Sequence, residues 1–160
     1  MANPFKLCMA SAISGTLTYQ GKPLSNAKIV REVDKPYRDS FKTFIYQTDE
    51  HGQFSVPVVY MYSFLGQFLP MEFVASDRLS VMYEGKLFEF WHAVRRQPNE
   101  NVEARGKPVN LLCSVDQEVS RIEINSNLVQ SYCTWDVEPD PPFDWSDENL
   151  FEPAPPKRNE

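Results

Sequence analysis

The chain has 160 residues, which is enough for one domain with a hydrophobic core and some additional chain. Its formal net charge of −6 lies entirely in residues 134–160, because residues 1–133 carry 14 acidic and 14 basic side chains. A neutral body without a basic stripe excludes the electrostatic footprint of a nucleic-acid-binding protein. We expect the few neighbouring basic side chains to be solvated at strand ends or in a loop: Arg95, Arg96, Arg105 and Lys107.

The cysteines and the N terminus bear on localisation. Cys8, Cys113 and Cys133 are odd in number and widely spaced, which fits neither a disulfide scaffold nor a CxxC zinc site. The apolar run in MANPFKLCMASAIS is about seven residues long and leads directly into a predicted strand, so we expect no signal peptide. These observations together predict reduced thiols and a cytoplasmic protein.

The first half of the chain contains short segments with apolar residues at alternate positions, the pattern of half-buried β-strands. Turn residues or polar loops separate these segments, and the predicted strands cover residues 13–19, 27–33, 41–48 and 53–60. Pro57 has no amide hydrogen to donate, so we expect the fourth strand to lie at a sheet edge or to contain a bulge.

The second half continues this pattern. Residues 78–83 and 87–94 predict a β-hairpin, because Gly85 between them can adopt a positive φ. A further strand is predicted at 109–115, and SRIEI, residues 120–124, is a shorter edge-strand candidate. Since no long amphipathic helix is present, the sequence predicts an all-β fold, an antiparallel β-sandwich of seven to eight strands.

One apolar segment, residues 58–73, does not fit a simple meander. It carries a single charge, Glu72, and is interrupted by Gly66 and Pro70. It is shorter than the ~20 residues of a transmembrane helix, so we predict no membrane span. The preferred interpretation is a buried crossover with one helical turn around residues 63–68. The alternative is an exposed patch, including Phe64 and Phe68, that contacts a partner or a membrane surface.

The periodic pattern stops after residue 132, which divides the chain into a sandwich domain, 1–132, and a tail, 133–160. The tail holds six of the 13 prolines and interleaves aromatic with acidic residues. Such a segment can dock onto a basic surface of a protein partner, with aromatic anchors and carboxylates that steer the encounter. It can equally fold back onto the sandwich, and both can hold for different parts. The predicted partner-binding residues of the tail are Trp135, Asp136, Phe143, Asp144, Trp145 and Phe151.

Catalytic chemistry has few candidates. The segment TDEHG, residues 48–52, contains one of only two histidines, His51, but we predict that it forms the turn of a β-hairpin, with Gly52 closing the turn. His92 stands alone beside aromatic residues, and a pairing with Cys113 has no supporting local motif. No HxH, HxxxH or HExxH spacing exists, so we predict no metal, no cofactor and no enzyme activity.

Two segments carry a family resemblance. ISGTLTYQGKPLSNAKIV followed by TDEHGQFSV resembles the carboxypeptidase-regulatory-like, or transthyretin-like, β-sandwich superfamily. The matching residues are Gly21, Pro23, Leu24, Ala27, Thr48, Asp49, Gly52 and Phe54. The resemblance implies a Greek-key arrangement, and the remainder of the chain looks like a small bacterial family built on that module. The YRGS motif of the related hydroxyisourate hydrolases and the HxH element of intradiol dioxygenases are absent.

The predicted function is therefore non-catalytic protein binding in a bacterium, most concretely as an immunity or accessory protein of a toxin or secretion system. The first alternative is a structural or surface module that binds carbohydrate or protein. The second is an enzyme that uses His51 or His92. The sequence leaves self-association open.

Overall fold

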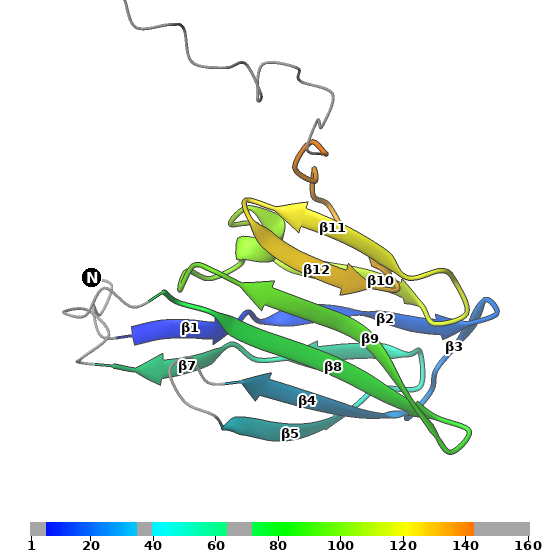
Figure 1. Ribbon diagram of the computed structural model, residues 1–160. Helices are drawn as coiled ribbons and strands as arrows, with labels where there is room; N and C mark the ends of the chain where they lie inside the picture. Colours follow the sequence, from blue (N-terminus) through cyan, green and yellow to red (C-terminus); the bar gives the residue numbers. More distant parts are fainter. Residues whose placement is uncertain (1–5, 35–39, 64–71, 143–160) are drawn as a thin grey trace, which may run out of the picture.

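The computed structural model describes residues 6–34, 40–63 and 72–142, and strands dominate it (Figure 1). A six-stranded sheet has the order β11 (Ser120–Ile124), β12 (Asn127–Ser131), β9 (Lys86–Arg95), β8 (Ala75–Tyr83), β4 (Lys28–Asp34), β5 (Phe41–Gln47). A five-stranded sheet has the order β13 (Cys133–Thr134), β10 (Val109–Ser114), β2 (Ile13–Tyr19), β3 (Lys22–Pro23), and β6 (Gln53–Val56) also pairs with β2. A small sheet joins β1 (Lys6–Ala10) to β7 (Val59–Tyr62).

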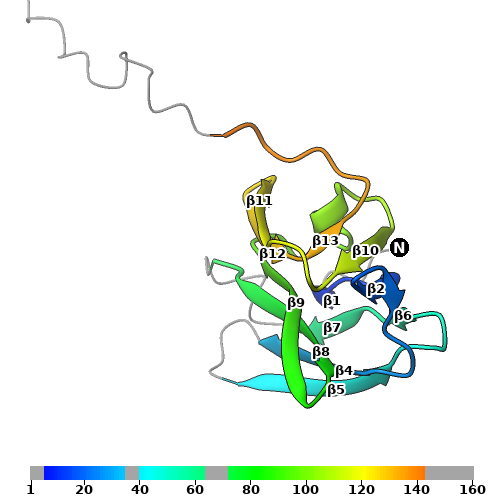
Figure 2. The same cartoon turned by 90° about the vertical axis from the view of Figure 1, so that its right-hand side faces the viewer.

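The two larger sheets form the layers of a sandwich, which Figure 2 shows from its end. Alternate residues of each strand point inward because successive side chains of a strand face opposite sides of the sheet. In β2, Ile13 and Leu17 are buried in this way, and β9 contributes the fully buried Trp91. Phe54 and Phe90 meet edge to face across the layers, with ring centroids 5.6 Å apart. The predicted all-β sandwich is confirmed.

One strand pairing, between β2 and β10, could not be predicted from the sequence pattern. These strands lie parallel, with Val109 opposite Ile13, whereas the other strand pairs in the described residues are antiparallel. Gly15 makes the close approach possible, because a Cβ atom at this position would lie 2.6 Å from the carbonyl oxygen of Leu111. This pairing brings together two segments that are about 100 residues apart in the chain and builds the sheet that carries the candidate site.

The prediction that TDEHG is a hairpin turn is wrong. The flanking strands lie in different sheets: β5 pairs with β4, and β6 pairs with β2. The segment folds as a tight turn, in which Asp49 Oδ1 accepts the amide hydrogens of His51 (2.8 Å) and Gln53 (2.9 Å). Thr48 Oγ1 donates to the carbonyl of Leu24 (2.6 Å), which ties the turn to the β3–β4 connection. The motif therefore carries the chain from one layer to the other.

The predictions for Pro57 and for the hairpin around Gly85 are confirmed. The predicted strand at 53–60 divides at Pro57 into β6 and β7, and β6 lies at a sheet edge as expected. The β8–β9 hairpin is confirmed, with φ of 48° at Glu84 and 75° at Gly85. The second hairpin, β11–β12, was predicted only in its first strand, and it turns through Asn125 and Ser126, both with positive φ.

The helical turn expected around residues 63–68 lies, apart from Ser63, outside the described residues. Within 6–34, 40–63 and 72–142, no helix has the length and hydrophobicity that a membrane crossing requires.

Candidate functional site

Two of the three cysteines are bonded to each other. Cys113 of β10 and Cys133 of β13 lie directly opposite one another in adjacent antiparallel strands and form a disulfide. The expectation of reduced thiols at these two positions is therefore wrong, because sequence spacing alone does not reveal that strands 20 residues apart become neighbours. Cys8 remains a free, buried thiol.

The disulfide lies beneath an uncharged surface on the outer side of the five-stranded sheet. Pairing in register places hydroxyl and amide side chains from three strands on this side, where Ser14 is opposite Asn110 and Thr18 is opposite Ser114. Leu112 lies between Thr16 and Thr134 at the centre, and it is 68 % exposed. We call this surface the hydroxyl face, and it consists of Ser14, Thr16, Thr18, Asn110, Leu112, Ser114 and Thr134.

A groove of ≈ 680 Å³ runs along the hydroxyl face. One wall consists of Gln117 and Glu118 from the connection between β10 and β11, together with Ser120 at the start of β11. Glu118 is the one charged residue among those that line the groove, which also include Tyr132 and both cysteines. On the far side of β2, the face continues into the uncharged side chains of Gln53 and Ser55. The arrangement offers hydrogen-bonding groups around one exposed aliphatic side chain.

The beginning of the predicted tail is docked on the sandwich. We call residues 133–142 the strap. Trp135 is partly buried; its ring meets that of Trp91 edge to face at 5.0 Å, and its Nε1 donates to the carbonyl of Glu103 (2.8 Å). Further along, Asp140 accepts the amide hydrogens of Asn125 (2.9 Å) and Ser126 (3.2 Å).

A basic side chain completes the attachment of the strap. Arg105 Nη2 lies 2.7 Å from Asp140 Oδ1, and its Nε donates to the carbonyl of Glu138 (3.0 Å). The amide hydrogens from the β11–β12 turn and the Arg105 guanidinium hold the pKa of Asp140 below its usual value. This part of the tail therefore follows the intramolecular alternative.

The structure locates two of the predicted partner-binding residues. Trp135 packs inward as described, and Asp136 is 93 % exposed, with Oδ2 3.5 Å from Lys107 Nζ. The structure therefore does not bring the two together as one exposed binding epitope. The remaining predicted residues lie outside the described part of the chain: Phe64, Phe68, Phe143, Asp144, Trp145 and Phe151.

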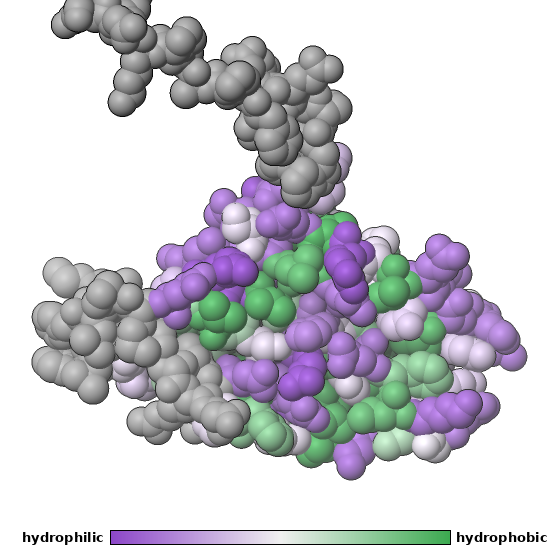
Figure 3. All heavy atoms as spheres, in the orientation of Figure 1, coloured by the Kyte–Doolittle hydropathy of each residue, from purple (hydrophilic) through white to green (hydrophobic). Residues whose placement is uncertain are grey.

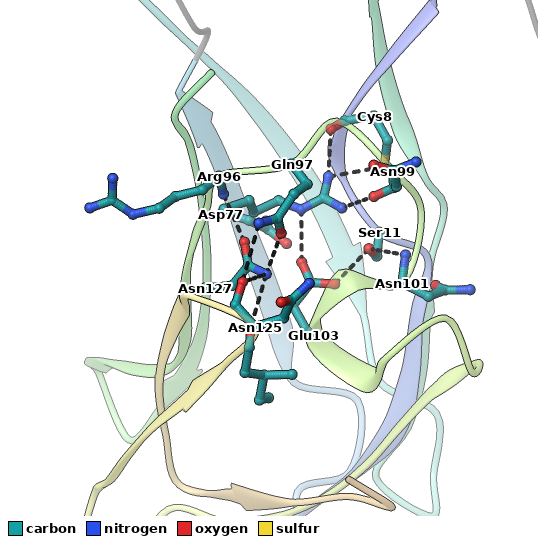
Figure 4. Close-up of polar contacts among 12 residues, drawn as sticks. Cys8, Ser11, Asp77, Arg96, Gln97, Asn99, Asn101, Glu103, Asn125 and Asn127 are labelled. Atoms are coloured by element: carbon teal, nitrogen blue, oxygen red, sulfur yellow. Dashed lines mark hydrogen bonds and ion pairs between the residues drawn. The ribbon is translucent and has the colours of Figure 1, made fainter. Parts of the chain in front are cut away.

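Buried charges form a second notable cluster, which sequence reasoning missed, and Figure 4 shows the part of it around Glu103, Ser11 and Cys8. Arg31 of β4 and Asp77 of β8 are both fully buried and form a bidentate pair, with distances of 2.9 Å (Nε–Oδ1) and 2.8 Å (Nη2–Oδ2). Arg31 also donates to the carbonyls of Ser11 (2.6 Å) and Pro57 (2.5 Å). These carbonyls belong to the β1–β2 and β6–β7 connections, so the pair ties both connections to the six-stranded sheet.

A neighbouring pair joins Arg95 to Glu103, and both side chains are again fully buried. The prediction that Arg95 is solvated is therefore wrong: its Nε lies 3.0 Å from Glu103 Oε1, while Ser11 Oγ donates to Glu103 Oε2 (2.7 Å). Arg95 Nη1 also donates to the carbonyl and the sulfur of Cys8. Burial raises the pKa of the Cys8 thiol, although Arg95 acts in the opposite direction. This cluster is enclosed and serves to fix the fold.

The two histidines lie apart. His51 is 72 % exposed at the turn, with Nε2 3.3 Å from Glu50 Oε1. His92 lies on the outer side of the six-stranded sheet, where it interacts with Ser76 Oγ (2.9 Å) and Glu89 Oε1 (3.5 Å). Figure 3 shows this side, with apolar groups scattered between hydrophilic ones. Within the described residues, no three His, Cys, Asp or Glu side chains converge as a metal site requires.

Comparison with known proteins gives a family without an assigned activity. Residues 13–118 match a family model described as a domain of unknown function, DUF6795. This segment runs from β2 to the end of β10 and the turn that follows, so it includes both strands that build the centre of the hydroxyl face. No curated protein and no solved structure matches the chain. Because the match covers more than half of the sequence, the chain belongs to the DUF6795 family.

Proposed function

We propose that the protein is a non-catalytic protein-binding module and that the hydroxyl face is its docking surface. One observation carries this proposal: Leu112 is 68 % exposed at the centre of an uncharged, hydrogen-bonding face beside a groove. Interfaces are typically depleted of charge at their centre and combine apolar anchors with polar groups that find partners. Ser, Thr and Asn side chains supply those groups at a lower desolvation cost than charged residues.

The free energy gained by burying Leu112 is large enough for it to act as an anchor residue of an interface. Complete burial of a leucine side chain contributes about 1.5–3 kcal/mol. This range corresponds to a factor of about ten to a hundred in Kd. Leu112 starts from high exposure, so most of its side-chain surface is available for burial by a partner.

The narrower form of the proposal is an immunity or accessory protein of a bacterial toxin or secretion system, built on a transthyretin-like module. The acidic, aromatic residues beyond the strap support a partner with a basic surface. Deletion of residues 143–160 tests their part separately, because it retains the Trp135 and Asp140 contacts of the strap.

The experiment uses the full chain, tagged and incubated with a lysate of the cells from which it comes. Leu112→Asp should abolish capture of a specific protein, because a charge would then be buried at the centre of the face. Leu87→Asp is the matched control: Leu87 is 52 % exposed in β9 of the other sheet, and its replacement should leave capture unchanged. Equal capture by wild type and Leu112→Asp would reject the hydroxyl face as the docking surface.

A second candidate, a structural or surface module, is favoured by the Cys113–Cys133 disulfide. Structural disulfides persist mainly in oxidising compartments and are rare in the cytoplasm of most organisms. Cell fractionation with immediate alkylation of free thiols separates the alternatives. An oxidised pair in an exported fraction supports the surface module, whereas recovery of the protein in the cytoplasmic fraction counts against it.

A further inference from the structure

Strand β5 is the end strand of the six-stranded sheet. One of its edges pairs with β4 from Phe41 opposite Asp34 to Gln47 opposite Lys28. The other edge has no strand partner among the described residues, and Figures 1 and 2 show β5 at the margin of the sheet. An end strand presents unpaired backbone donors and acceptors, which are a template for another strand.

The composition of β5 does not protect this edge. Its sequence is FKTFIYQ, seven residues with Lys42 as the single charge and without proline. Its register with β4 shows no bulge. Phe41 and Ile45 project from the outer side of the sheet and are 61 % and 56 % exposed. Proteins commonly block exposed edges with charges, prolines, bulges or covering segments, and the described residues of β5 have only the one lysine.

The opposite end of the same sheet shows the contrast. Strand β11 carries the charged residues Arg121 and Glu123. The strap also covers it, because the amide of Asp140 donates to the carbonyl of Glu123 (2.7 Å). One end strand therefore carries charges of both signs and is contacted by the strap, whereas β5 carries one charge and has no second strand partner among the described residues.

We propose that β5 pairs antiparallel with β5 of a second copy of this chain, in a register centred on Phe44. This register aligns all seven residues: Phe41 faces Gln47, Lys42 faces Tyr46, and Thr43 faces Ile45. No like charges face each other, whereas a register centred on Lys42 would oppose two lysines and align fewer residues. The two six-stranded sheets then form one continuous sheet around a two-fold axis. This surface is distinct from the hydroxyl face, so the inference goes beyond the proposed function.

The test measures the mass of the purified full chain by analytical ultracentrifugation over the micromolar range. Wild type should sediment as a dimer of 18.5 kDa chains. The double variant Thr43→Lys/Ile45→Lys puts lysine opposite lysine at two places in the proposed register, and it should weaken dimerisation at least tenfold. The matched control, Thr43→Lys/Ile45→Glu, puts lysine opposite glutamate at the same two places and should remain dimeric.

Both positions are exposed, so neither variant should disturb folding, and circular dichroism with thermal unfolding verifies this. A monomeric wild type would overturn the proposal, because the free edge of β5 would then not pair with a second copy of the chain. Equal behaviour of the two double variants would overturn the register. A dimer that survives Thr43→Lys/Ile45→Lys but dissociates on Leu112→Asp would show that the copies meet through the hydroxyl face, which also overturns it.

Discussion

Replacement of Asp77 by asparagine gives the sharpest test of how the sandwich is held together. The Asp77 carboxylate is the charged partner of a guanidinium that has no exposure to solvent. Asparagine preserves the size of the side chain and one acceptor oxygen but removes the negative charge. Breaking a buried ion pair by removal of one partner costs about 3–5 kcal/mol, because the other charge stays buried without compensation. Since domains of this kind have a total stability of about 5–15 kcal/mol, the loss is a large fraction.

The same two strands provide the control on their opposite side. Arg78 Nη2 lies 3.8 Å from Glu32 Oε2, and the two side chains are 36 % and 37 % exposed. Such solvated pairs contribute at most about 1 kcal/mol, so Glu32→Gln should have little effect. The buried and the exposed ion pair thus join adjacent positions of the same two strands, β4 and β8. A difference in stability between the two variants therefore cannot result from a different position in the sheet.

Equilibrium unfolding in urea, with the disulfide intact, measures both variants. At an unchanged slope of about 1–3 kcal/mol/M, a loss of about 3–5 kcal/mol lowers the Asp77→Asn midpoint by roughly 1–5 M, or the variant should already be unfolded in buffer. At the same slope, Glu32→Gln should shift the midpoint by at most about 1 M. Similar, small shifts for both variants would refute the argument that charge compensation at Arg31 governs stability.

Three further outcomes follow from local geometry. The contribution of Asp140 to folding stability should be complete above its unfolded pKa of about 4 and be lost as pH falls through its lowered folded pKa. At neutral pH the backbone amide hydrogens of Asn125 and Ser126 should therefore exchange faster with solvent in Asp140→Asn than in the wild type. Unchanged exchange would contradict the strap contact. Burial raises the Cys8 pKa, so a thiol reagent at pH 8 should modify unfolded but not native protein, as mass spectrometry can measure. Gly15→Ala should cost about 1–3 kcal/mol in urea unfolding, because its Cβ would lie 2.6 Å from a carbonyl oxygen of β10, and a neutral effect would exclude the close parallel approach.

Strand positions were predictable because they depend on local alternation. The segments 13–19, 41–48 and 109–115 all contain observed strands, and the hairpin around Gly85 follows from its turn chemistry. The buried charges could also have been inferred from the same alternation of inward and outward residues. Arg31 alternates with Ile29 and Val33 on the inward side of its strand, so an inward charge could have been inferred and a buried partner sought.

Pairing between distant strands was beyond the sequence. Nothing in the residues around Ile13 and Val109 indicates that they are parallel neighbours, and the Cys113–Cys133 bond depends on the placement of β13 beside β10. The hydroxyl face exists only through these pairings, which is why Leu112 was predicted merely as one residue of a strand. The TDEHG turn failed for a related reason: the sequence identified the turn, but its flanking strands join different sheets.

The positions of the two surfaces have a functional consequence. The hydroxyl face belongs to the five-stranded sheet, and the β5 edge belongs to the six-stranded sheet, so pairing through β5 would leave both hydroxyl faces of a dimer free. A dimer would then be bivalent, and a partner that presents two sites would gain affinity by effective concentration rather than by new contacts. Thr43→Lys/Ile45→Lys should therefore weaken binding to an immobilised, dense partner while leaving the affinity for a single partner molecule in solution unchanged. If the variant lost binding to the immobilised partner and also affinity for the single partner molecule, the β5 edge itself would contact the partner, because a valency effect cannot alter one-to-one binding.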